Sequence, residues 1–261
     1  MRQGLLAAAA AQIGNFLLEP AEGPRAEPAE PVGARGAAVA ANRGSAPVAQ
    51  RESARVPLSP PGPRPVVAVF GLARRCGATV VARALAAELA ARDPEAVAAV
   101  ASERRAGGIP LATLAAGRLA ATLADVPGAT TTAVGRLCLV EGAERLALAE
   151  AARALAPLVI DAGTTEVEGE PATVADRVLL VSAPGIEPAL AAAAAACVQR
   201  FAGEAVIVLN RAASNAEPPG GAGIVLPASR MGAQLALGGR QARGELGRAI
   251  GALADICGAA K

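Results

Sequence analysis

From Pro65 onward the chain alternates short apolar runs with longer stretches of helical periodicity. The apolar runs are continuous, which is typical of strands in a parallel sheet covered on both faces. They predict strands at residues 66–70, 96–101, 137–140, 158–161, 178–182, 206–210 and 224–226. The periodic stretches predict helices at residues 79–92, 110–124, 143–155, 187–201, 229–237 and 242–257. This alternation predicts a doubly wound, mostly parallel, three-layer α/β domain over residues 65–261.

The first 64 residues have a different pattern. Residues 1–19 arrange Leu5, Ile13 and Phe16 around an alanine run, which predicts a short amphipathic helix. Polar interruptions argue against a secretory signal, and the stretch is too short and too polar to span a bilayer. Either it anchors a protein partner or a membrane surface, or it has no role. Residues 20–64 hold nine of the chain's twenty prolines and no aromatic residue, which predicts a disordered tether.

Four loops follow predicted strand ends, at residues 71–79, 161–165, 183–187 and 210–213. In a doubly wound sheet, ligands bind at the carboxyl ends of the strands. These loops are therefore candidates to line one edge of the sheet and to form a single site there.

The first of these loops has the layout of a phosphate-binding loop: a buried strand, a turn containing Gly71 and Gly77, and a helix opened by Thr79. Such a loop normally ends in Gly-Lys-Ser/Thr, but here the tripeptide is Gly77-Ala78-Thr79. Lys261 is the only lysine in the chain, so no other lysine is placed to replace the missing one. The alternative is that the glycines merely serve a tight strand–helix turn.

Composition narrows the classes of function. The chain has no His, which excludes His-based triads and His metal ligands. The chain has three Phe and no Trp or Tyr, so few aromatic side chains are present on which the bases of single-stranded nucleic acid could stack. The net charge of +2 gives no general attraction to DNA. The four cysteines form no CxxC pair, which favours reduced thiols in a cytosolic protein.

Several segments, taken in order, resemble the ParA/MinD superfamily of deviant Walker-A P-loop ATPases. Within it they are most similar to the CpaE/TadZ-type proteins that position pilus and secretion machinery. The segments are GATVVARALAAELA for the loop and its helix, LAPLVIDAGTT for the Walker-B strand, ADRVLLVSAPGIEPALAA for a later strand and helix, AVIVLNRA for the strand before the base contact, and GIVLPASRMGAQLALGGR for the segment after it.

The resemblance implies a P-loop NTPase-like fold and a nucleotide site. Gly71, Gly77, Ala78 and Thr79 would surround the phosphates, with Arg74 and Arg75 where the family has glycines. Thr79 and Asp161 would hold Mg²⁺, and Asn210 with Arg211 would contact adenine. From the residues alone, Asp161 could simply cap the next element, and Asn210 and Arg211 could be ordinary polar residues at a strand end.

The departures from the family pattern concern charge. Ala78 and Ala73 stand where the family has its two lysines, and the second strand ends in Ala101-Ser102-Glu103 instead of a clear switch carboxylate. Loss of a charge-assisted bond to phosphate costs about 1.5–3 kcal/mol. Catalysis suffers more, because phosphoryl transfer depends on electrostatic stabilisation. The sequence therefore predicts weak or absent binding of ATP and Mg²⁺, and little hydrolysis.

Three functions follow from this interpretation. The first is a spatial-organiser or regulatory protein with protein partners from pilus, secretion or cell-positioning machinery. It would form a homodimer and lie in the cytoplasm or peripherally at the membrane or cell pole. The second is an active ATPase that uses Arg74 or Arg75 in place of lysine. The third is a nonspecific DNA-binding partition protein using C-terminal arginines such as Arg230 and Arg248, which the modest charge disfavours.

Overall fold

The computed structural model describes residues 64–92, 97–102, 111–164, 170–202, 205–218 and 223–258. The predicted helix at residues 1–19 and the predicted tether at residues 20–64 lie outside these ranges, except for Arg64. Arg64 donates its backbone N–H to the carbonyl oxygen of Arg153 at 3.1 Å and leads into the first strand.

One eight-stranded sheet forms the centre of the domain, in the order β3-β4-β2-β5-β1-β6-β7-β8. The strands are β1 (Val66–Gly71), β2 (Ala98–Ala101), β3 (Thr130–Val134), β4 (Leu137–Glu141), β5 (Leu158–Gly163), β6 (Arg177–Ser182), β7 (Ala205–Ala212) and β8 (Ile224–Pro227). All neighbouring strands are parallel except β3 and β4, which are antiparallel. The predicted mostly parallel sheet is confirmed, with β1 near its middle.

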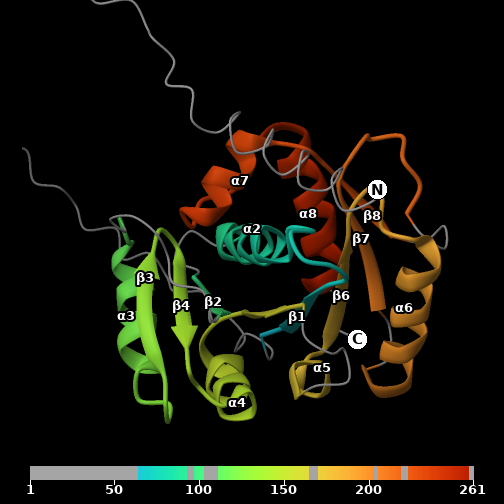
Figure 1. Cartoon of the computed structure of the whole chain (residues 1–261). Coiled ribbons are helices and arrows are strands. Elements are labelled where there is room, and N and C mark those ends of the chain that lie inside the picture. Colours follow the sequence, from blue (N-terminus) through green and yellow to red (C-terminus); the bar gives the residue numbers. More distant parts are fainter. Residues whose placement is uncertain are drawn as a thin grey trace, which may run out of the picture. The chain divides into compact units, whose positions relative to one another are not determined.

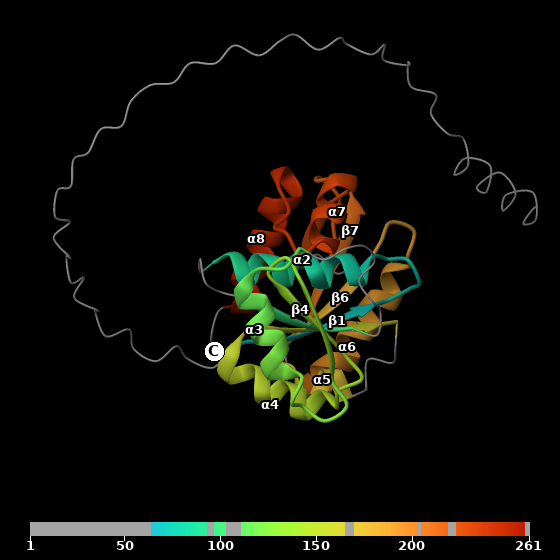
Figure 2. The same ribbon diagram turned by 90° about the vertical axis from the view of Figure 1, so that its left-hand side faces the viewer.

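Helices cover both faces of this sheet. They are α2 (Ala78–Ala91), α3 (Leu114–Leu123), α4 (Arg145–Leu155), α5 (Glu170–Val174), α6 (Pro188–Ala202), α7 (Arg230–Leu237) and α8 (Gly244–Gly258). In Figures 1 and 2, α2, α7 and α8 lie on one side of the sheet, and α3, α4, α5 and α6 lie on the other. The structure therefore has the three layers that the sequence predicts.

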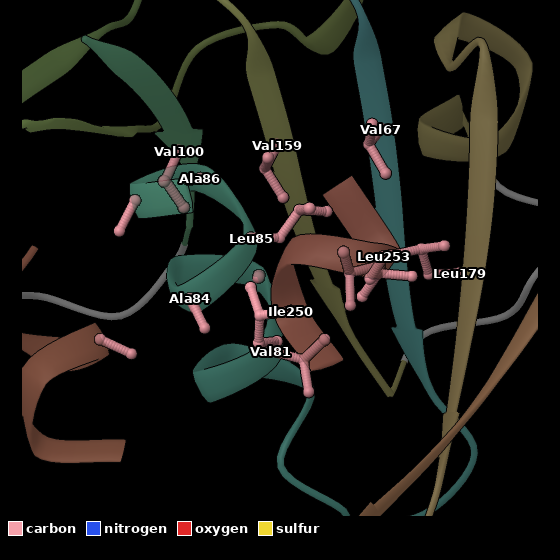
Figure 3. Packing of buried hydrophobic residues seen from close by; sticks show 14 of the residues in the cluster. Val67, Val81, Ala84, Leu85, Ala86, Val100, Val159, Leu179, Ile250 and Leu253 are labelled. Carbon is pink, nitrogen blue, oxygen red and sulfur yellow. The ribbon is translucent and has the colours of Figure 1, made fainter. Parts of the chain in front are cut away.

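The strands alternate their side chains between these two layers. In β1, Val67 and Val69 pack with α2 and α8, whereas Val66, Ala68 and Phe70 pack with the helices of the other face. Figure 3 shows the first of these clusters, in which α2 and α8 meet the sheet. Every residue of β1 is buried, which explains why the strand reads as one continuous apolar run.

Three details differ from the sequence-based expectation. Strand β3 was not predicted, because its Thr-rich sequence lies at the sheet edge and exposes alternate residues. Helix α5 is only five residues long and was also missed. Helix α3 begins at Leu114, four residues after the predicted start, because the Thr113 hydroxyl caps it by accepting the Ala116 backbone N–H at 3.2 Å.

Candidate functional site

The loop between β1 and α2 is tightly packed at its base. Leu72 donates its backbone N–H to the Val181 carbonyl oxygen of β6 at 3.0 Å, which ties the loop to the neighbouring strand. A Cβ on Gly71 would lie 2.7 Å from Cys76 Sγ and 3.2 Å from the Gly163 carbonyl oxygen. Only glycine fits there without rearrangement, so Gly71 is needed for the loop to close over its own Cys76 side chain.

The start of α2 is open to an anion. Gly77 precedes the helix with φ of 95°, and no side chain caps the N-terminal turn. A cavity of about 540 Å³ lies against this turn, lined by residues 73–80 together with Gly163 and Thr164. Backbone N–H groups and the helix dipole at such an end favour negative charge. Among the described residues that line the cavity, none is acidic.

Positive side chains at this cavity come from Arg74 and Arg75. Both are exposed, and both line the cavity. Ala78, at the position of the P-loop lysine, is buried at 7% exposure, and a Cβ on Gly71 would lie 3.3 Å from its methyl carbon. The loop thus keeps the shape of an anion site, while its cationic groups lie three and four residues earlier than the lysine would.

Asp161 and Thr79 supply oxygen atoms of the kind that Mg²⁺ takes together with substrate phosphates. Thr79 lines the cavity at the start of α2, and Asp161 lies at 7% exposure near the end of β5. The Asp161 carboxylate accepts the Ser102 hydroxyl at 3.4 Å and the Gly163 backbone N–H at 3.3 Å. Both side chains are of donor types that suit Mg²⁺, but Asp161 is not among the residues that line the cavity.

Arg83, on α2, lies within electrostatic range of Asp161. It is buried at 4% exposure and donates Nη1 to the Leu237 carbonyl oxygen at 3.3 Å. Burial lowers the pKa of the Arg83 guanidinium, and the Asp161 carboxylate raises it. Burial is the larger of the two effects, so the pKa of Arg83 is lowered overall.

Asn210 and Arg211, at the end of β7, lie against the β1–α2 loop. Asn210 donates Nδ2 to the Cys76 carbonyl oxygen at 2.8 Å, and Arg211 donates Nη2 to the Arg75 carbonyl oxygen at 2.6 Å. Arg211 and Arg75 both have positive φ, at 59° and 63°. A Cβ on Gly77 would collide with the Asn210 amide nitrogen. The two residues therefore hold the loop through its carbonyl groups.

The domain is similar to known structures. It matches the crystal structure of a ParA family ATPase from Chlorobium tepidum, with a TM-score of 0.50 and 14% identity, over 74% of this chain and 98% of that one. The fold is that of a ParA family ATPase.

One further structural match is weaker, and the two sequence comparisons find nothing. The MinC:MinD cell division protein complex from Aquifex aeolicus matches with a TM-score of 0.49 and 12% identity, over 74% of this chain and 95% of that one. At such identities the likeness concerns the fold alone. No protein-family model and no curated protein matches the sequence.

On this ParA-type fold, the predicted site residues come together. Gly71, Arg74, Arg75, Gly77, Ala78 and Thr79 form the loop and the first turn of α2, with Asn210 and Arg211 bonded to them. Asp161 lies one strand away, on β5 next to β1. The loop at residues 183–187 follows β6, the strand to which Leu72 is bonded.

Three features of the site are not predicted by the sequence. The first is the pair of hydrogen bonds from β7 to the loop. The second is the Ser102 side chain, which lies at the end of β2 and donates to Asp161; its position at a strand end was the available signal. The third is Arg83, whose burial nothing in the helical pattern indicates. Glu103, the carboxylate that follows Ser102 in the sequence, lies outside the described residues.

A second cavity, of about 470 Å³, is also lined by Arg75. It is bounded by α2, the end of β7, β8, and helices α7 and α8. It shares Arg75, Gly77 and Val80 with the first cavity, but most of its wall is apolar.

None of the described helices is long and apolar enough to cross a membrane.

Proposed function

We propose that this protein is a ParA/MinD-like spatial organiser or regulatory protein with a degenerate nucleotide site. It binds Mg·ATP weakly or not at all, and it hydrolyses ATP little or not at all. The observation that supports this most directly is Ala78. A buried methyl group occupies the lysine position at the open end of α2. The shape of the phosphate site is retained without the charge at its end.

In the proposed complex, the phosphates lie against the first turn of α2. The backbone around Gly71, Gly77, Ala78 and Thr79 surrounds them, and Arg74 and Arg75 add charge from the exposed side. Thr79 and Asp161 hold Mg²⁺, whose chemistry would be to neutralise phosphate charge. Asn210 and Arg211 contact the base; Asn210 does so with its amide oxygen, because its amide nitrogen donates to the loop.

Two features explain the weakness that we propose. Loss of the lysine removes about 1.5–3 kcal/mol of charge-assisted hydrogen bonding to phosphate, which is a tenfold to hundredfold loss in affinity. Hydrolysis also requires a group that orients water. At the end of β2, the described side chain beside Asp161 is Ser102, which is hydrogen-bonded to that carboxylate. Phosphoryl transfer without preorganised charge is slow.

In the proposed role, the protein acts by binding protein partners and not by catalysing a reaction. We propose docking on pilus, secretion or cell-positioning components of the CpaE/TadZ type, with a homodimer as the working state. Residues 1–19 would recruit a second component through the tether at residues 20–64. The proposed location is the cytoplasm, or the periphery of the membrane or cell pole.

A titration with a fluorescent ATP analogue and Mg²⁺ tests the nucleotide part. We expect no saturation below roughly 100 μM, which corresponds to less than about 5.5 kcal/mol of binding free energy. Saturable micromolar binding that Asp161→Ala abolishes would overturn the proposal. Arg118→Ala is the matched control, because it removes an exposed arginine on α3.

The second candidate function is an active ATPase. It is favoured by the two exposed arginines, Arg74 and Arg75, which line the same cavity as Thr79. Steady ATP turnover that disappears in the Arg74→Ala/Arg75→Ala double variant would establish it. The Arg118→Ala variant should then keep the turnover of the unmodified chain.

A further inference from the structure

An open apolar groove lies between α3 and the end of α4, on the face of the sheet opposite to α2. Its volume is about 560 Å³, and most of its lining comes from α3, with Leu155 of α4 and Val97 completing it. Leu114 is 74% exposed and Leu155 is 45% exposed, so the described residues leave much of these two side chains uncovered. Exposed apolar side chains gathered at a groove are typical of a surface that binds another segment.

The described part of the chain begins at Arg64, beside this groove. Arg64 donates its backbone N–H to the Arg153 carbonyl oxygen at 3.1 Å, and Arg153 lies two residues before Leu155 on α4. Asp176 fixes this entry: its carboxylate accepts Arg153 Nη1 and Nη2 at 2.9 and 2.8 Å and the Val66 backbone N–H at 2.8 Å. The residues that precede Arg64 in the sequence therefore start within one helical turn of the groove.

Residues 56–63 have the sequence VPLSPPGP, in which four of the eight residues are proline. Proline fixes φ near −65° and favours an extended polyproline II conformation, so such a segment loses little chain entropy when it binds. Polyproline II has no internal hydrogen bonds, which leaves its carbonyl oxygens free to accept bonds from a partner surface. A segment of this composition suits an apolar groove that also carries hydrogen-bond donors.

The groove has both properties. Leu114, Leu119 and Leu155 supply aliphatic surface for proline rings and for Leu58. Arg118 is exposed at the groove, and its guanidinium carries five N–H donors that suit carbonyl oxygens. None of the described lining residues is acidic, so no carboxylate there competes for these donors. Eight residues of polyproline II span about 25 Å, which exceeds the roughly 12 Å of helix over which α3 lines the groove.

We propose that residues 56–63 bind in the groove between α3 and α4, as an extended Pro-rich ligand of their own domain. The proline rings and Leu58 lie against the leucines, and carbonyl oxygens accept hydrogen bonds from Arg118. Docking leaves residues 20–55 as the free part of the tether and so limits the reach of residues 1–19; this consequence rests on the proposed recruitment role. The docking itself does not involve nucleotide, because the groove lies where α4 leads into the start of β5, whereas the phosphate loop follows the other end of β1.

Tryptophan fluorescence of the full chain tests this docking, because the chain has no Trp or Tyr of its own. Leu58→Trp places an indole in the docking segment, and Val48→Trp places one in the free part of the tether. We expect acrylamide to quench Leu58→Trp about threefold less than Val48→Trp, because a binding site covers most of a bound side chain. Adding Leu155→Ser should raise the quenching of Leu58→Trp to that of Val48→Trp. Adding Leu190→Ser, which removes a leucine of similar exposure on α6, should leave it unchanged.

The docking is disproved if the two Trp variants are quenched equally, or if Leu155→Ser and Leu190→Ser have the same effect. It is also disproved if the protection of Leu58→Trp disappears on dilution, because the occupant of the groove is then a second copy of the chain. Circular dichroism checks the fold of each variant; if Leu155→Ser unfolds the chain, Leu114→Ser at the more exposed position replaces it with the same expected result. Turnover of ATP would contradict the proposed function without changing these measurements.

Discussion

The two cavities beside Arg75 differ in what they retain. The first is polar, lined by the loop and the uncapped start of α2, and it has the form of a phosphate site without the lysine. The second is apolar, with its interior amide donor bonded to the loop. The loop's shape and its charge therefore have separate causes. Its shape is held by packing and by β7, and its charge depends on a few exposed side chains.

The largest expected effect concerns the shape of the loop. Gly77→Ala should destabilise the fold by about 3 kcal/mol, because the new methyl group meets the Asn210 amide in a backbone conformation with φ of 95°. Gly163→Ala is the control, with φ of 64° and no neighbouring atom within 4 Å. It should cost about 1 kcal/mol from backbone strain alone. Urea denaturation measures both, and equal losses would show that Asn210 does not define the loop.

The next effect concerns the charge of the loop. Ala78→Lys should tighten binding of a fluorescent Mg·ATP analogue about tenfold to hundredfold, because it restores the ammonium group at the open end of α2. Ala121→Lys adds the same charge at an exposed position on α3 and should not change the affinity. If neither variant tightens binding, the missing cation is not what limits the site.

Smaller effects are expected where β7 meets the loop. Asn210→Ala removes the donor to a buried part of the loop and should cost about 1–2 kcal/mol. Arg211→Ala removes a hydrogen bond from an exposed side chain and should cost about 0.5 kcal/mol. Urea denaturation gives the ranking, and hydrogen exchange of the loop amides shows where the loss acts. A larger effect for Arg211 would reverse our account of which bond holds the loop.

Much of the fold follows from the hydrophobic pattern. Strand β1 and helix α2 lie within one residue of their predicted bounds. Burial on both faces of the sheet gives β1 a continuous apolar run, and α2 is a long alanine-rich segment with helical periodicity. Strand β3 could not be found in this way. It lies at the edge and pairs antiparallel with β4, so its Thr side chains face solvent and the apolar run disappears.

The site follows from sequence only in part. The order of strand, glycine turn and helix indicates the loop, and the parallel sheet indicates that residues 210–213 end at the same edge. The bond from Asn210 to Cys76 joins residues 134 positions apart and depends on the register and on the amide orientation. Burial of Arg83 likewise depends on how α7 packs on α2, which no local pattern records.

Steady-state ATP turnover by the full chain with Mg²⁺ tests the central claim most directly. We expect a rate equal to the background rate measured without protein, because the proposed phosphate site lacks the lysine at residue 78. The same assay on the Arg74→Ala/Arg75→Ala variant should give the same rate. Turnover clearly above the buffer rate, lost when those two arginines are removed, would contradict the account and identify a working ATPase.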